Sequence, residues 1–292
     1  MGLDEFINQL PEDDQSAINY ASLPELSRLT GPEASEFGQL WLEWSSERVL
    51  NIVERMVSLC ETQPDVEFEV IYKQGLNHPD PAVRVASLKG LEESEDRALV
   101  IPLSKMLKSD PAPEVRTAAT IPLAHLSMMA EIGKLSPRYR ETLEDTLYGV
   151  LEDEQEIQDV KLKVMEAVSV FAAERLTTHI ELAWASGDLK ARQSSLFAMG
   201  QTSDPKWIGY VIPDLEHDAA SVRYEAAMAM GELGDEHHLR VMDAPLDDED
   251  LTVQLAAISA VERIGGDVAK AKLGLKLSSP EPQVVELVQQ AL

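Results

Sequence analysis

The chain has 292 residues, of which 52 are Asp or Glu and 25 are Lys or Arg, so its formal net charge is −27. Because nucleic-acid affinity comes mainly from cations that displace counterions, this balance argues against a DNA or RNA partner. No apolar run reaches the length of a membrane span, and the acidic start over residues 1–6 lacks the pattern of a signal peptide. Cys60 is the single cysteine, which excludes an internal disulfide, and we expect a cytoplasmic protein.

Residues 1–64 do not show the repeat that dominates the rest of the chain. Two helices are predicted here, over 33–44 and 46–61, and the second has an amphipathic pattern of apolar residues. We interpret residues 1–64 as an N-terminal helical cap that covers the first repeat, with Trp41 and Trp44 in its core. A separate peptide-binding role for this region is the alternative.

From residue 65 onward, an arginine or an equivalent residue returns about every 31 residues. These anchors stand at positions 84, 116, 161, 192, 223, 254 and 285. The step from 116 to 161 is longer, which we interpret as one repeat with an insertion near 128–140. A period in this range is typical of a solenoid of stacked helix pairs.

The repeat over 204–233 shows how one unit is built. Asp204 and Pro205 suit the N-cap and the first position of a helix, and an apolar face follows at helical spacing. A polar turn at 216–218 leads to a second amphipathic helix, in which Gly231 allows close approach. Such a helix pair cannot bury its faces alone, so it must stack on its neighbours.

The same pattern predicts a helix pair in each repeat. First helices are predicted over 66–76, 97–108, 138–151, 174–186, 205–216, 236–246 and 267–277. Second helices are predicted over 81–92, 113–128, 156–172, 188–200, 219–232, 250–264 and 281–292. Pro122 stands inside one of them and should bend it.

Two stretches carry a family resemblance: Asp-Ala-Ala-Ser-Val-Arg-Tyr-Glu-Ala-Ala-Met-Ala-Met-Gly-Glu-Leu-Gly over 218–234, and Asp-Pro-Ala-Val-Arg-Val-Ala-Ser-Leu over 80–88. They resemble the HEAT-repeat family, in particular its short bacterial branch related to the phycobiliprotein-lyase repeats. The resemblance covers about residues 65–292. It implies an all-α fold, a right-handed α-solenoid (α-α superhelix) of about seven HEAT-like helix pairs in one continuous domain. It also implies that first helices form the convex face and second helices the concave face.

The recurring arginines stand at equivalent positions of the second helices, and acids precede several of them. The arginines are Arg84, Arg116, Arg192 and Arg223, and the acids are Asp80, Asp188 and Asp218. Stacked Asp and Arg side chains can pair along a solenoid and cap helix starts. The resemblance implies the same structural ladder. A comb of phosphate-binding cations is the alternative, which the neighbouring acids disfavour.

Turns between first and second helices form an acidic ridge on one edge of the predicted solenoid. Acids at helix N-termini favour the helix dipole by roughly 0.3–1 kcal/mol each, which explains most of them without a ligand. The run from Asp247 to Asp250 exceeds what a cap needs, so a basic protein segment or adventitious Ca²⁺ is a second interpretation. The spacing does not match a calcium loop.

Positions one and five residues after each anchor should point away from the core, onto the concave surface. The candidate partner-binding residues at these positions are Phe197, Tyr224, Met228, Leu255, Gln193 and Leu162. Exposed aromatic and Met residues are enriched at binding surfaces. The alternative is that neighbouring second helices bury these side chains.

Catalytic and metal-binding patterns find little support. The resemblance includes HEAT-like enzymes that hold a di-iron site with His-Glu dipeptides, but this chain has no His-Glu dipeptide. His237 and His238 read as a solvated turn, and Cys60 as a buried thiol without a histidine nearby in the sequence. We therefore expect no catalytic residue, no metal and no cofactor.

These patterns favour a non-catalytic scaffold that holds a protein or peptide, including a basic one, in the concave groove of the solenoid. The alternative is a bilin-lyase-like or other HEAT-type enzyme or chaperone that acts on a protein substrate, which the resemblance allows. The last predicted helix has no polar capping helix after it, and we expect a monomer.

Overall fold

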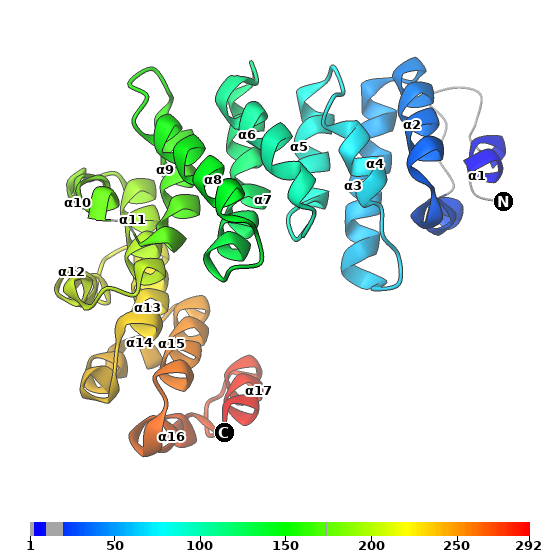
Figure 1. Ribbon diagram of the computed structural model, residues 1–292. Coiled ribbons are helices and arrows are strands. Elements are labelled where there is room, and N and C mark those ends of the chain that lie inside the picture. Colours follow the sequence, from blue (N-terminus) through cyan, green and yellow to red (C-terminus); the bar gives the residue numbers. More distant parts are fainter. Residues whose placement is uncertain (1–2, 10–19, 173) are drawn as a thin grey trace. The chain divides into compact units, whose positions relative to one another are not determined.

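The computed structural model describes residues 3–9, 20–172 and 174–292, and every regular element in those ranges is helical (Figure 1). The predicted all-α fold class is confirmed by this arrangement of successively packed helices. The chain forms two compact units, Met1–Val160 and Lys161–Leu292, called unit 1 and unit 2 below. Neither unit ends at residue 64, and the division into a cap over 1–64 and one array over 65–292 stays a prediction.

Unit 1 consists of α-helices with short 3₁₀ helices, marked η, between some of them. Its elements are α1 (Leu3–Gln9), η1 (Tyr20–Arg28), α2 (Gly31–Leu40), η2 (Trp41–Glu43), α3 (Ser46–Thr62), α4 (Glu69–Gly75), α5 (Pro81–Gly90), η3 (Arg97–Leu99), α6 (Val100–Ser109), α7 (Pro113–Glu131) and α8 (Pro137–Leu151). The helix α9 (Gln158–Val168) begins in unit 1 and continues into unit 2.

Unit 2 repeats the same two-helix plan. Its further elements are η4 (Ser169–Phe171), η5 (Glu174–Leu176), α10 (Thr177–Ala185), α11 (Leu189–Thr202), η6 (Pro205–Trp207), α12 (Ile208–Asp214), α13 (Ala220–Leu233), η7 (Glu236–Met242), α14 (Asp243–Leu246), α15 (Leu251–Ile264), α16 (Gly266–Lys276) and α17 (Pro282–Ala291). The first helices of four pairs open with a 3₁₀ turn, where the sequence predicts one uninterrupted helix. Hydrogen bonds of the tighter 3₁₀ type are common in the first turn of a helix.

Stacking within unit 1 follows the two rows expected of helix pairs. The second helices α3, α5 and α7 pack in succession, while α2 packs on α4 and α6 on α8. The pair α2–α3, predicted as part of a cap, therefore continues both rows. Trp41 is fully buried in this pair, whereas Trp44 is half-buried against the ring of Phe37. Residues 1–2 and 10–19 of the predicted cap lie outside the described residues.

Within unit 2, the second helices α11, α13, α15 and α17 pack in succession, and each first helix packs on the second helix of its own pair (Figure 1). Two glycines let these helices approach closely. A Cβ atom on Gly231 would lie 2.8 Å from the Cα atom of Ala260, and one on Gly200 would lie 3.1 Å from the Cα atom of Ala229. Both distances are shorter than ordinary van der Waals contact, so a glycine at each position sets the spacing of the row.

Aspartates in the turns define where several second helices begin. Asp80 accepts a hydrogen bond from the backbone N–H of Ala82 at 2.9 Å, and Asp188 accepts one from that of Ala191 at 2.8 Å. These bonds satisfy backbone donors that have no partner inside the helix. In the part of the chain that the structure describes, no helix is long and apolar enough to cross a membrane.

Candidate binding surface

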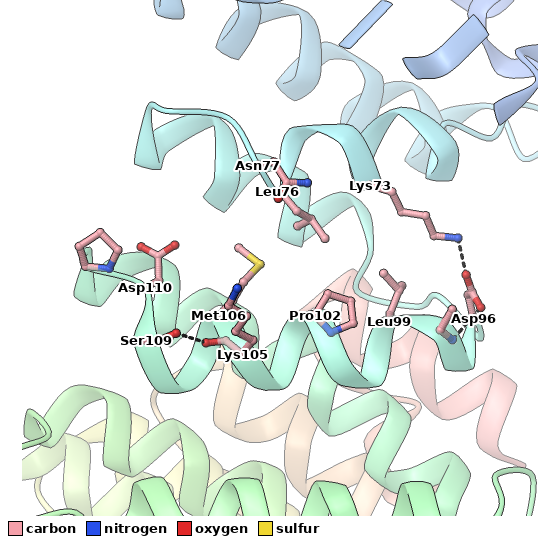
Figure 2. Close-up of a pocket in the computed structure, with 12 residues that line it drawn as sticks. Lys73, Leu76, Asn77, Asp96, Leu99, Pro102, Lys105, Met106, Ser109 and Asp110 are labelled. Carbon is pink, nitrogen blue, oxygen red and sulfur yellow. Dashed lines mark hydrogen bonds and ion pairs between the residues drawn. The ribbon is translucent and has the colours of Figure 1, made fainter. Parts of the chain in front are cut away.

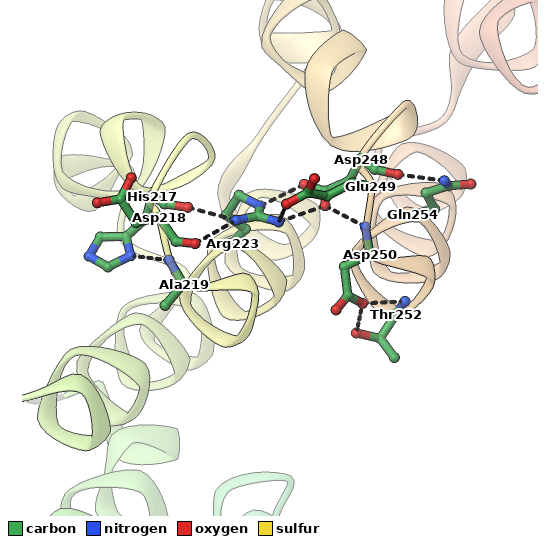
Figure 3. A network of polar contacts seen from close by, with 9 residues as sticks. All are labelled: His217, Asp218, Ala219, Arg223, Asp248, Glu249, Asp250, Thr252 and Gln254. Atoms are coloured by element: carbon green, nitrogen blue, oxygen red, sulfur yellow. Dashed lines mark hydrogen bonds and ion pairs between the residues drawn. The ribbon is translucent and has the colours of Figure 1, made fainter.

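Arg223 shows how the anchor arginines are held (Figure 3). Its guanidinium donates backwards to the carbonyl oxygen atoms of His217 and Asp218, at 2.9 and 3.0 Å. It also donates forwards in a bidentate pair to Asp248, in the turn of the following repeat, at 2.7 and 2.8 Å. Arg223 therefore ties its own turn to the next one.

The other three anchor arginines repeat this arrangement with different acids. Arg84 reaches Asp110 at 2.8 Å, and Arg116 holds Glu156 in a bidentate pair at 2.7 and 2.8 Å. Each of the two also donates to a carbonyl oxygen of its own turn. The hydrogen bond with Glu156 raises the pKa of Arg116; burial alone would raise the pKa of Glu156, but its bond with Arg116 leaves that pKa lowered.

Arg192 has the most enclosed partner. It donates to both carboxylate oxygen atoms of Asp214, at 2.6 and 2.8 Å, and its guanidinium stacks on the ring of Trp184 at 3.8 Å from the centroid. The indole Nε1 of Trp184 donates to the same carboxylate at 3.0 Å. Asp214 is almost fully buried, so these bonds carry most of what compensates its charge.

The structure places other carboxylates opposite the arginines than the three acids expected from the sequence. Asp80 and Asp188 cap their own helices, and Asp218 contributes its backbone carbonyl. The acids that face the guanidinium groups are Asp110, Glu156, Asp214 and Asp248. Because every guanidinium is occupied by a carboxylate and by carbonyl oxygen atoms, these arginines are internal links between repeats.

The acidic run over 247–250 is also accounted for by local contacts (Figure 3). Asp248 accepts hydrogen bonds from Arg223, which lower the pKa of the Asp248 carboxyl. Asp250 caps α15 through the backbone N–H of Thr252 at 2.8 Å. Asp247 accepts from Lys276, while Glu249 is exposed. These contacts explain three of the four acids without a ligand.

A different surface of unit 2 remains open to solvent. We call it the second-helix face, defined as the exposed surface of α11, α13 and α15. Phe197 and Met228 are each 38% exposed and Tyr224 is 36% exposed, while Leu255 and Gln193 are half-buried. Gln193 donates to the hydroxyl of Ser221 at 2.9 Å, which links α11 to α13 across this face.

Leu162 corrects the sequence-based set. It is only 5% exposed, so it cannot take part in a solvated surface. The rule of one and five residues after the anchor fails here because Leu162 packs into the core around α9 instead of facing solvent.

Polar side chains occupy one equivalent position on three consecutive second helices, α9, α11 and α13. Lys163, Ser194 and Glu225 each stand two residues after an anchor, on consecutive second helices. Glu166 accepts a hydrogen bond from Ser194 and forms an ion pair with Lys163 at 2.7 Å. Glu225 is half-buried. Its burial, and to a smaller extent repulsion from Glu166, raise its pKa to about 7.

The hollows on described surfaces include three that sequence reasoning did not name. One of about 410 Å³ lies between α13 and α15, where Met228 is joined by Arg263 and Glu232, which form an ion pair at 2.7 Å. One of about 540 Å³ lies between α4 and α6 in unit 1, with Leu76, Pro102 and Met106 in its wall (Figure 2).

The third hollow, of about 640 Å³, lies between α3 and α5. Val85 and Lys89 line it, one and five residues after the anchor Arg84. The positions one and five residues after an anchor therefore line this groove in unit 1 as well. The sequence favours the positions in unit 2 because they carry aromatic residues and Met.

The described residues include no group of three or more His, Cys, Asp or Glu arranged to hold a metal ion. Cys60 is half-buried, and its Sγ atom lies 3.7 Å from both the carbonyl oxygen of Val66 and the hydroxyl of Tyr72. Burial raises the pKa of Tyr72.

Taken by its fold, the protein is an α-solenoid of stacked helix pairs. The family model for HEAT repeats matches residues 177–262, which cover α10 to most of α15, and this supports a HEAT-repeat protein. The bacterial, lyase-like branch of the resemblance stays a prediction. The sequence matches no curated protein.

Solved structures give distant similarities only. Human deoxyhypusine hydroxylase in complex with glycerol is 16% identical, with a TM-score of 0.38, and the match covers 89% of this chain and 95% of that one. An engineered protein is 17% identical, with a TM-score of 0.46, over 90% of this chain and 78% of that one. Neither similarity carries an argument about what this chain does.

Proposed function

We propose that this protein is a non-catalytic scaffold that binds a segment of a partner protein on the second-helix face of unit 2. The observation that carries the proposal is the exposure of Phe197, Tyr224 and Met228 on neighbouring helices. Large apolar side chains gathered on one surface are typical of protein-binding sites, and aromatic residues dominate the energetics of such sites.

The arginine links support this proposal, because they connect successive repeats without using the exposed apolar side chains of the face. Arg192 and Arg223 hold successive repeats together through Asp214 and Asp248, and these contacts do not involve Phe197, Tyr224 or Met228. A surface presented by packed helices is preorganised, which lowers the entropy cost of binding. The net charge of −27 favours a protein partner over a nucleic acid, and the half-buried Cys60 fits a reducing cytoplasm.

Replacement of the two aromatic residues tests the proposal. Peptides are first selected from a random display library on the wild-type protein, and their synthetic versions are measured by calorimetry. We expect the double variant Phe197→Ser, Tyr224→Ser to lose at least about tenfold in affinity, since truncation of a hot-spot side chain costs on the order of 2 kcal/mol.

Leu275→Ser in α16 is the matched control, because Leu275 is the most exposed of the large apolar side chains and lies on a first helix. It should bind the peptides as the wild type does. The melting temperature of the double variant should stay close to that of the wild type. Equal binding by the double variant and the wild type contradicts the proposal, and a large loss of stability would show that the two aromatics belong to the core.

A further inference from the structure

Glu225 is the one half-buried carboxylate of the second-helix face whose charge is left uncompensated. Of its neighbours Glu166 and Lys163, the lysine already pairs with Glu166 at 2.7 Å. Among the described residues, none forms a hydrogen bond or an ion pair with the Glu225 side chain. A half-buried carboxylate without a partner is unfavourable, because burial removes part of its hydration without replacing it.

Other charged groups near α13 are already engaged. Arg192 of α11 is bound to Asp214 of α12, and Arg263 of α15 is bound to Glu232. Ser194 of α11 gives its hydroxyl proton to Glu166. None of these groups forms an ion pair with the negative charge of Glu225.

Exposed apolar and aromatic side chains lie on the same helix as this carboxylate and on the helix packed against it. Tyr224 precedes it on α13, Met228 follows one turn later, and Phe197 stands on the neighbouring helix α11. All three are exposed. Aromatic faces attract organic cations, and the aliphatic stem of a lysine or arginine can cover apolar surface while its charged end reaches a carboxylate.

We infer that the occupant of the second-helix face of unit 2 is a partner segment with a lysine or arginine next to a bulky apolar residue, whose cation meets Glu225. The inference rests on the proposed function and adds the chemistry of the partner to it. Charge complementarity supports the choice, since the face presents acids and the whole chain has a net charge of −27.

This occupant makes binding depend on pH. Burial and repulsion from Glu166 hold the pKa of Glu225 at about 7 in the free protein, so about half of the molecules are protonated at neutral pH. A cation favours the ionised form, and binding then releases a proton. Affinity rises with pH through 7 and should be about tenfold higher at pH 8 than at pH 6.

The test uses peptides selected at pH 8 on the full chain from a random library without His, Asp or Glu. We expect the selected sequences to be enriched in Lys or Arg next to Leu, Phe, Met or Trp. Their blocked synthetic versions should bind about tenfold more weakly at pH 6 than at pH 8. The variant Glu225→Gln should bind at least about tenfold more weakly at pH 8 and lose the pH dependence.

Glu216→Gln is the control, because it removes the same charge from an exposed turn residue and should keep both the affinity and the pH dependence. Unfolding is not expected to interfere. Folding raises the pKa of the Glu225 carboxyl, so this group makes the folded protein less stable as pH rises from about 4.5 to about 7. Glu225→Gln should therefore be at least as stable as the wild type at pH 8.

Each other outcome overturns the inference in a distinct way. Peptides that depend on Phe197 and Tyr224 but show no basic enrichment and no pH response would leave the proposed function standing and remove the cation. Absence of any peptide that depends on those two residues would remove both. A dimer seen by light scattering, broken by Tyr224→Ser, would assign the face to a second copy of the chain.

Discussion

Among single residues, Asp214 has the most demanding environment. It is almost fully buried and accepts hydrogen bonds from Arg192 and from the indole of Trp184. Removal of one member of such a buried group leaves the others without a partner, which is more costly than the loss of an exposed ion pair.

Asp214→Ala should therefore lower the free energy of unfolding by about 3–5 kcal/mol, measured by urea denaturation. Asp218→Ala is the control, because the sequence pointed to Asp218 as the partner of Arg223 but the structure gives its side chain no ion pair. It should cost no more than about 0.5 kcal/mol. Equal losses in the two variants would contradict the assignment of the pairs.

The sequence predicted a ladder of the four arginines with Asp80, Asp188 and Asp218, whereas the structure pairs the arginines with other acids. Asp110, Glu156 and Asp248 lie in acidic turns that the sequence marks, yet each turn contains several acids. Which of them reaches an arginine depends on how the next repeat is placed, and local pattern does not contain that information. Asp214 is hidden further, because it ends α12 instead of lying in the turn.

At the scale of helices, the predicted bounds agree closely with the structure, because residues next to each helix start determine where it begins. An aspartate at the N-cap marks the start of α5, α11 and α15, and the observed helices begin at Pro81, Leu189 and Leu251. The burial of Leu162 was missed for the opposite reason. It depends on how neighbouring elements pack around α9, which the local sequence pattern does not contain.

Gly231 tests the spacing of the second-helix row. Gly231→Ala places a methyl group 2.8 Å from the Cα atom of Ala260, so α13 and α15 must move apart. We expect a loss of about 1–3 kcal/mol in the free energy of unfolding, in spite of the better helix propensity of alanine.

Gly209→Ala in α12 is the matched control, since a methyl group there meets nothing within 4 Å. It should be neutral or stabilising by up to about 1 kcal/mol. Thermal or urea unfolding of the two variants compares the effects directly. A stabilised Gly231→Ala protein would mean that the two helices are not in close contact at this position.

For the whole molecule, two compact units offer several surfaces, and the acidity of the chain selects among their partners. Unit 1 has a groove between α4 and α6 and another between α3 and α5, while unit 2 has the second-helix face. The face in unit 2 combines exposed aromatics with an uncompensated carboxylate, which is why we place the partner there. From the sequence, the aromatic pattern was visible, whereas the state of Glu225 required the structure.

The most direct measurement is NMR of methyl-labelled methionine during titration with a selected peptide. Met228 lies on the second-helix face, and Met106 lines the groove between α4 and α6 in unit 1 (Figure 2). Our account predicts a saturating shift of the Met228 methyl signal and an unchanged Met106 signal. A shift of Met106 with Met228 unchanged would contradict it and move the binding surface to unit 1.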